Sequence, residues 1–175
     1  MTGRFFHRPG TDGRPVFTCD PFGIRIDRQG IWHYRGSPIN RQELVCLFAS
    51  FLARQPDGSY WLITPEESGP ITVDDVPFMA VEMFVAGQGK KQFISLRTNV
   101  DEIITVDSLH PLRVSIDPGT SEPAPYVQVR NSLEARLSRA VFYELVAMGV
   151  EEQCAGRLSF GVWSSEIFFP LGQPT

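Results

Sequence analysis

Two arginines stand where the sequence predicts that a strand ends and a helix begins. Arg35 closes a strand-like run that starts at residue 31, ahead of a helical run over residues 41–54. Arg130 closes a second strand-like run, ahead of a helical run over residues 133–148 in which Arg136 lies one turn along. Free amides and the helix dipole at a helix N-terminus attract anions, and a guanidinium binds carboxylate or phosphate through two N–H groups. The pattern predicts a site for a small anionic ligand.

The same arginines also have a purely structural interpretation. Glu43, Glu134 and Glu144 lie near them in the sequence and would neutralise them as ordinary ion pairs. Surface ion pairs of that kind contribute little to stability and imply no ligand. Both interpretations remain open from the sequence.

Three more residues complete the candidate ligand-binding set: Glu82, His33 and Trp61. Glu82 interrupts the apolar run over residues 78–85, which we expect to form a central strand that is apolar on both faces. A buried carboxylate requires a partner, and Arg97 or Arg113 would supply one from a neighbouring strand. The interpretations are a structural ion pair or a ligand contact.

No motif in the chain specifies a reaction. The histidines are scattered, no Cys-x-x-Cys pair occurs, and no Gly-x-Ser-x-Gly elbow is present. Residues 87–91 (Gly-Gln-Gly-Lys-Lys) lack the spacing of a phosphate-binding loop, so we interpret them as a hairpin turn. Cys46 falls in the apolar stripe of the first predicted helix, where a thiol is usually inert. The sequence predicts no catalytic residue, no metal ligand and no cofactor.

Composition indicates an ordinary globular protein. Of its 175 residues 42% are hydrophobic and 21% charged, and no apolar run approaches the ~20 residues that span a membrane. The first ten residues lack the apolar segment of a signal peptide, and three widely spaced cysteines suit a reduced setting, so we expect a cytoplasmic protein.

Charge is unevenly distributed along the chain. Residues 1–41 hold seven arginines against three aspartates, which gives +4, whereas the remainder carries −8. A basic arm on an acidic body either contacts an acidic partner or folds back onto its own body. The overall pI near 5.4 makes nucleic acid an improbable partner. The expected partners are a small anionic ligand or another protein.

A strand–helix–strand order recurs in the two parts of the chain. We expect the first helix to be capped by Asn40 and the second by Asn131. The helical stripes place four residues in the core: Leu47, Phe48, Val141 and Leu145. Alternating or apolar runs predict strands over residues 24–27, 31–35, 78–86, 91–98, 103–106 and 112–116.

These elements predict an α+β fold made of two structurally similar repeats. Each repeat would be a small, mostly antiparallel sheet with one main helix. The first would occupy residues 1–76, with a basic arm over residues 1–19, and the second residues 77–175. Any shared site would then lie between the repeats.

Several ordered stretches resemble a bacterial family known as domain of unknown function 1285. They comprise residues 24–26, 32–39, 44–48, 61–65, 78–82, 96–99, 110–113 and 134–145, so the resemblance runs from about Asp20 to about Gly172. It implies a two-part fold with internal repetition and a link to signalling. It implies no activity and no catalytic residue.

Two functional hypotheses follow. The first is a non-catalytic ligand-binding or signalling adaptor domain with its site between the repeats. The second is an enzyme of unrecognised type that uses His33, Glu82 and the arginines of the same cleft. A cleft that brings His33 or Glu82 within hydrogen-bond reach of another polar side chain would favour the enzyme.

Overall fold

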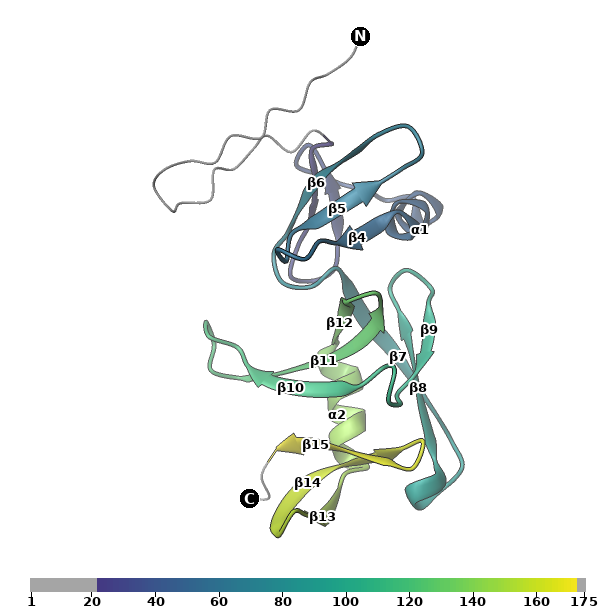
Figure 1. Cartoon of the computed structure of the whole chain (residues 1–175), viewed down its shortest axis with the longest axis vertical. Coiled ribbons are helices and arrows are strands. Elements are labelled where there is room, and N and C mark those ends of the chain that lie inside the picture. The colour runs from purple at the N-terminus through teal and green to yellow at the C-terminus, as the bar shows by residue number, and fades with distance from the viewer. Residues whose placement is uncertain (1–21, 173–175) are drawn as a thin grey trace.

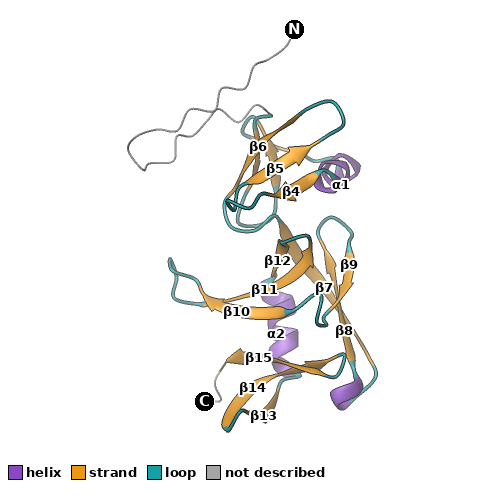
Figure 2. Ribbon diagram, viewed as in Figure 1, coloured by secondary structure: helices purple, strands orange, loops and turns teal. Residues whose placement is uncertain are grey.

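The protein is built mainly from short antiparallel strands, as the computed structural model in Figures 1 and 2 shows. The structure describes residues 22–172, so the basic arm over residues 1–19 lies outside the described part. The N-terminal half, residues 22–76, lies above the C-terminal half in Figure 1, and the chain passes between them once, from β6 to β7. No helix within residues 22–172 has the length and apolar character needed to cross a membrane.

The N-terminal half contains one six-stranded sheet and one helix. Its strands are β1 (Ile24–Ile26), β2 (Trp32–Tyr34), β3 (Ser37–Pro38), β4 (Leu52–Arg54), β5 (Tyr60–Ile63) and β6 (Ser68–Val73), and its helix is α1 (Gln42–Ser50). The sheet order is β3-β2-β1-β6-β5-β4, and only the β1–β6 pair is parallel. The predicted hairpin at residues 24–35 is confirmed.

The C-terminal half contains a second six-stranded sheet, a small third sheet and one helix. The six-stranded sheet comprises β7 (Phe78–Ala86), β8 (Phe93–Thr98), β9 (Ile103–Thr105), β10 (Leu112–Ile116), β11 (Pro123–Arg130) and β12 (Leu133–Leu137). Its order is β10-β11-β12-β7-β8-β9, and the β12–β7 pair is parallel. Helix α2 (Arg139–Ala147) leads to the third sheet, which comprises β13 (Val150–Cys154), β14 (Arg157–Ser164) and β15 (Ile167–Gly172). A short 3₁₀ turn (Gly89–Lys91) lies in the β7–β8 connection, as expected for a hairpin turn rather than a phosphate loop.

The order of three strands, one helix and three strands occurs twice. It runs through β1–β3, α1 and β4–β6, and again through β10–β12, α2 and β13–β15. In the first passage all six strands share one sheet, whereas in the second they divide between two sheets. The structure is therefore mostly sheet with two helices, and the C-terminal half is larger than the single sheet expected from the sequence.

The second predicted helix begins later than expected. Residues 133–137 are strand β12, because Leu133, Ala135 and Leu137 alternate with outward polar residues and are all buried. The helix starts after Ser138, whose hydroxyl accepts a hydrogen bond from the amide of Val141 at 3.3 Å. The prediction of an Asn131 cap was wrong. Leucines four residues apart satisfy both a helical and an alternating pattern, so spacing alone could not separate them.

The first helix is shorter than predicted, and a different face of it is buried. It ends at Ser50, and residues 52–54 form β4. Its buried residues are Val45 and Ala49, with Phe48 packed against the core, while Leu47 is 50% exposed. Placing Leu47 in the core was wrong, because residues 44–48 are apolar on nearly every side. The expected Asn40 cap is also wrong, since Arg41 is at the N-cap and makes no side-chain capping bond.

A continuous hydrophobic core and a set of polar bonds join the two halves. The main buried cluster extends from Ile24 to Leu171 and includes both Val141 and Leu145, as predicted. At the seam, Nδ2 of Asn99 donates to the carbonyl of Gly30 in the N-terminal half at 2.8 Å. Oδ1 of Asn99 accepts from the amide of Met79 at 2.9 Å, which fixes the Asn99 side chain within the C-terminal half. The halves are thus held in one arrangement by bonds to backbone groups, which have little freedom to move.

Candidate ligand-binding cavity

Arg130 joins the two halves of the protein. Its Nε donates to both carboxylate oxygens of Glu102, at 3.0 and 3.2 Å, and its Nη2 donates to the carbonyl of Ala49 at 2.6 Å. Ala49 lies in the last turn of α1, where the helix dipole favours a cation. The predicted position at a helix N-terminus was wrong, because a hairpin turn and β12 follow Arg130. Arg130 does form an ion pair, but its partner is Glu102 rather than Glu43, Glu134 or Glu144.

Arg35 also precedes a strand and not a helix. It occupies the β2–β3 turn with a φ of 48°, and its guanidinium lies 5.2 Å from the centre of the Tyr34 ring. Tyr34 pairs with Ser37 in that hairpin as Arg130 pairs with Leu133 in the other. Arg35 therefore lies in its turn and Arg130 at the last paired position, so the two arginines are not structurally equivalent.

Glu82, His33 and Trp61 each bond locally. Glu82 accepts from Nε of Arg97 at 2.7 Å, one of the two expected partners, but its side chain is half exposed because the outer half of β7 faces solvent. Its predicted burial was wrong. Nε2 of His33 lies 2.8 Å from Oδ2 of Asp27, and Nε1 of Trp61 donates to the hydroxyl of Ser59 at 3.0 Å.

The Asp27 contact of His33 serves a turn. Oδ1 of Asp27 accepts from the amides of Gln29 and Ile31 at 2.9 and 3.0 Å. Partial burial opposes ionisation of Asp27, but the hydrogen bonds from His33 and from these amides outweigh it and hold the pKa of Asp27 below its ordinary value. The pair therefore stabilises the β1–β2 turn.

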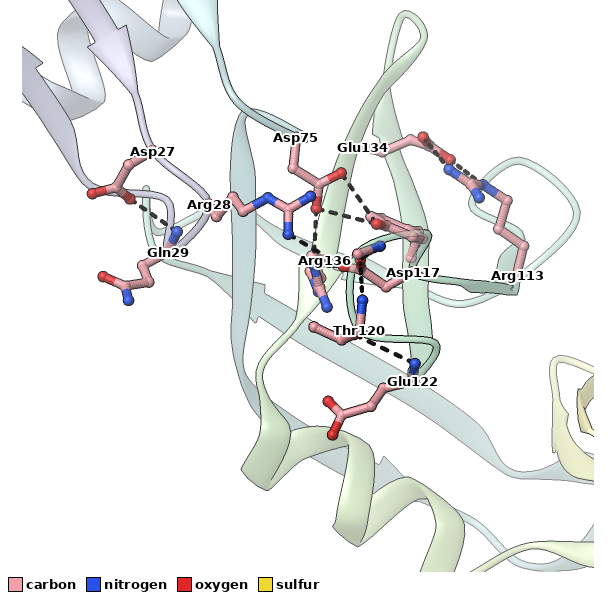
Figure 3. A network of polar contacts seen from close by, with 12 residues as sticks. Asp27, Arg28, Gln29, Asp75, Arg113, Asp117, Thr120, Glu122, Glu134 and Arg136 are labelled. Atoms are coloured by element: carbon pink, nitrogen blue, oxygen red, sulfur yellow. Dashed lines mark hydrogen bonds and ion pairs between the residues drawn. The ribbon is translucent and has the colours of Figure 1, made fainter.

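Arg136, one of the predicted residues, lines a substantial cavity. It lies on β12, and its Nη1 donates to Oδ2 of Asp75 at 3.2 Å and to Oδ2 of Asp117 at 3.3 Å. Figure 3 shows Arg136 between these aspartates, with Arg28 approaching Asp117 from the N-terminal half. The hydroxyl of Tyr126 donates to both oxygens of Asp75 at 3.1 Å.

The pKa values of Asp117 and Tyr126 in this network are displaced. Backbone hydrogen bonds from Gly119 and Thr120, with the nearby guanidiniums, hold the pKa of Asp117 below its ordinary value against the effect of burial. Burial, and secondarily the charge of Asp75, raises the pKa of Tyr126. Asp117 is thus favoured as a carboxylate and Tyr126 as a neutral phenol, and the hydrogen bonds of the network hold the Arg136 guanidinium in place.

A cavity of about 410 Å³ opens beside Arg136 at the start of α2. Its polar lining comes from Glu122, Arg136, Ser138 and Arg139. Its apolar lining comes from Met79, Pro123, Pro125, Leu137, Phe142 and Tyr143. The size is that of a small-molecule site, and a mainly apolar wall with a few polar groups is typical of such sites.

The charged group most accessible to an occupant of the cavity is Arg139. Its side chain is 75% exposed, and its Nη2 lies 3.7 Å from Oε2 of Glu122, which is 63% exposed. An ion pair so exposed contributes little, so an incoming anion can replace Glu122 at small cost. The first amides of α2 also lack carbonyl partners within the helix, which adds positive potential on this side.

The sequence pointed to only part of this cavity. Arg136 was predicted as a ligand contact, but β11 and the first turn of α2 supply most of the wall. Tyr143, which also lines the cavity, is 63% exposed. Placing the helix start at Ser138, a residue type that favours caps, would have revealed the cavity lip.

A second, more open cavity of about 380 Å³ lies between the two halves. Arg54, Gln55, Pro56 and Gly58 line it from the β4–β5 turn, and Ser132 lines it from the β11–β12 turn. Neither His33 nor Glu82 lines either of the two cavities. Among residues 22–172, no three His, Cys, Asp or Glu side chains are grouped as a metal site would require.

Comparison with known proteins identifies the family. A crystal structure at 2.50 Å of a DUF1285 family protein from Silicibacter pomeroyi DSS-3 shares 45% identity, with a TM-score of 0.81, over 87% of this chain and 80% of that chain. A second, at 1.40 Å, of a DUF1285 family protein from Shewanella baltica OS155, shares 25% identity, with a TM-score of 0.57, over 71% and 91% of the two chains. No curated protein matches.

Two family models cover nearly the whole sequence. The DUF1285 N-terminal domain, a domain of unknown function, matches residues 12–76, and the DUF1285 C-terminal domain, described as a protein of unknown function, matches residues 77–171. The resemblance inferred from the sequence is confirmed: the chain belongs to the DUF1285 family.

Proposed function

We propose that this protein is a non-catalytic ligand-binding or adaptor domain, and that its ligand is a small molecule with an anionic group and an apolar, preferably aromatic, body. The observation that carries the proposal is the cavity at the start of α2. It combines Arg136 and Arg139 with an apolar wall in a space large enough for such a molecule. This position lies within the C-terminal half, so it replaces the expected site between the repeats.

The anionic group would bind Arg139. Among the residues that the structure describes, this guanidinium has only the loose contact with Glu122, whereas Arg136 already has two carboxylates on one nitrogen. A charge-assisted hydrogen bond to Arg139 would therefore be formed at little expense. Phe142 and Tyr143 would receive the apolar body, because aromatic rings offer large flat surfaces with a polar edge.

Two fluorescent probes test the proposal directly. Anilinonaphthalene sulfonate carries an aromatic body and an anion, and N-phenylnaphthylamine carries a similar body without the charge. Titrations would use wild-type protein, Arg139→Met, Tyr143→Ser and, as a matched control, Arg157→Met. Arg157 is an exposed arginine on β14 that lines neither cavity.

We expect Arg139→Met to weaken the sulfonate probe about tenfold, equivalent to about 1.4 kcal/mol, and to leave the neutral probe unchanged. Tyr143→Ser should weaken the binding of both probes, and Arg157→Met should change the binding of neither. Unchanged melting temperatures would show that the probes do not report loosened protein. Equal sulfonate affinity in wild type and Arg139→Met would refute the proposal.

We also propose that the two passages of three strands, a helix and three strands derive from one duplicated unit, with β7–β9 added to the second. Their common element order supports this. The first and last strands of each passage are also neighbours: β1 pairs with β6, and β10 lies against β15. Superposing β1–β6 with α1 on β10–β15 with α2 tests it, and opposite strand directions would contradict it.

Free thiols at Cys46 and Cys154 support the cytoplasmic setting that the ligand-binding proposal assumes.

A further inference from the structure

Asp117 receives one arginine from each half of the protein on the same oxygen atom. Its Oδ2 accepts from Nη1 of Arg28 at 3.4 Å and from Nη1 of Arg136 at 3.3 Å (Figure 3). The Asp117 side chain is only 3% exposed, and its Oδ1 is occupied by the amides of Gly119 and Thr120 at 2.8 and 3.3 Å. Because those bonds fix the carboxylate, the two guanidiniums share one acceptor that cannot turn to serve them separately.

The loop that carries Asp117 also forms a wall of the cavity. This 117–122 loop joins β10 to β11, and the amide of Asp117 donates to the carbonyl of Glu122 at 2.8 Å. Glu122 and the following Pro123 line the cavity. Arg136 lines it from the opposite strand while contacting Asp117. An occupant would therefore touch Arg136 directly and would touch the loop that carries Asp117 at Glu122.

On the other side, Arg28 belongs to a firmly held turn of the N-terminal half. The β1–β2 turn is closed by bonds from the amides of Gln29 and Ile31 to Asp27. Gly30 packs so closely against the C-terminal half that an added Cβ would lie 2.9 Å from Nδ2 of Asn99. A change in the ion pair between Arg28 and Asp117 therefore affects the whole β1–β2 turn and not only Arg28.

We propose that the N-terminal half senses occupancy of the cavity through Asp117. An anion bound to Arg139 also attracts Arg136, which lines the same cavity, partly away from Asp117. Asp117 then binds Arg28 more fully, which tightens the β1–β2 turn against the 117–122 loop. This inference rests on the proposed function, since it needs a ligand in the cavity. Linkage requires the effect to be reciprocal, so losing Arg28 weakens ligand binding although Arg28 does not line the cavity.

The test combines probe titration with hydrogen exchange on wild type, Arg28→Met and Arg25→Met. Arg25 is the matched control, because it is an exposed arginine on β1 that pairs with Asp74 and, within residues 22–172, forms no hydrogen bond or ion pair with Asp117, Asp75 or Arg136. We expect Arg28→Met to weaken anilinonaphthalene sulfonate roughly fivefold, at the low end of measured couplings because Arg28 is 54% exposed. Arg25→Met should bind as wild type does.

Hydrogen exchange separates this coupling from a simple loss of positive charge near the cavity. In wild type, saturating sulfonate probe should slow exchange of the amides of residues 27–31, whereas the neutral probe should not. The slowing should vanish in Arg28→Met, and residues 60–63 of β5 should be unaffected throughout. If the probe binds in an Arg139-dependent manner but leaves exchange at residues 27–31 unchanged, the coupling is wrong and the proposed function stands. If wild type binds no probe, both are overturned.

Discussion

Replacing Arg130 with methionine should destabilise the ligand-free protein. Methionine keeps most of the aliphatic volume but removes the bonds from Nε to Glu102 and from Nη2 to the Ala49 carbonyl. Hydrogen bonds that involve a charged group contribute about 1.5–3 kcal/mol each. The Arg130 and Glu102 side chains are 28% and 32% exposed, so solvent weakens their ion pair. The bond to the Ala49 carbonyl therefore accounts for a larger share of the stabilisation. We expect the free energy of unfolding to fall by about 2–3 kcal/mol.

Urea denaturation followed by circular dichroism measures this change. For a chain of this size, about 2–3 kcal/mol corresponds to a melting temperature lower by roughly 5–10 °C. Arg139→Met is the control, since Arg139 is 75% exposed and its carboxylate partner lies 3.7 Å away, so its stability should change by less than about 0.5 kcal/mol. If both variants unfold at the wild-type urea concentration, Arg130 does not join the halves as we argue.

Three further changes test the fold and its electrostatics. Leu145→Ala should cost about 2–5 kcal/mol because Leu145 is fully buried, whereas Leu47→Ala should cost less than about 0.5 kcal/mol, and equal urea midpoints would show that α1 and α2 are misplaced. Gly161→Ala should cost about 1–3 kcal/mol or more, since its Cβ would lie 2.2 Å from the carbonyl oxygen of Phe169; an unchanged midpoint would contradict that approach. Asp117 has a lowered pKa, so its ionised form adds stability above about pH 4 that is lost as pH falls through the folded-state pKa. Melting temperatures of Asp117→Asn should therefore trail wild type at pH 7 and converge with it in acid, and a constant difference would refute that cause.

Much of the strand content was predictable because it depends on local patterns. The hairpin at residues 24–35 and the long strand β7 follow from alternation and apolar runs bounded by glycine. The start of α2 was not predictable, because the spacing of Leu133 and Leu137 fits a helix and a strand equally. Their burial in β12 depends on pairing with β7, a strand far away along the chain.

The candidate site was predictable only at Arg136, and for a reason that proved incorrect. The sequence placed Arg136 on a helix, whereas it reaches the cavity from a strand that ends where the helix begins. The predicted helix N-terminus after Arg130 was wrong because an arginine at the end of a strand has the same local sequence pattern whether a helix or a hairpin follows. Its partners, Glu102 and Ala49, lie 28 and 81 residues away along the chain, a separation that no local pattern reveals.

The most direct measurement is a crystal structure of the protein grown with anilinonaphthalene sulfonate. The account predicts the probe at the start of α2, with its sulfonate bonded to Arg139 and its rings against Phe142 and Tyr143. Density for the probe elsewhere, such as on the half-exposed Phe84 and Phe93 of the outer sheet face, with the α2 cavity empty, would contradict it.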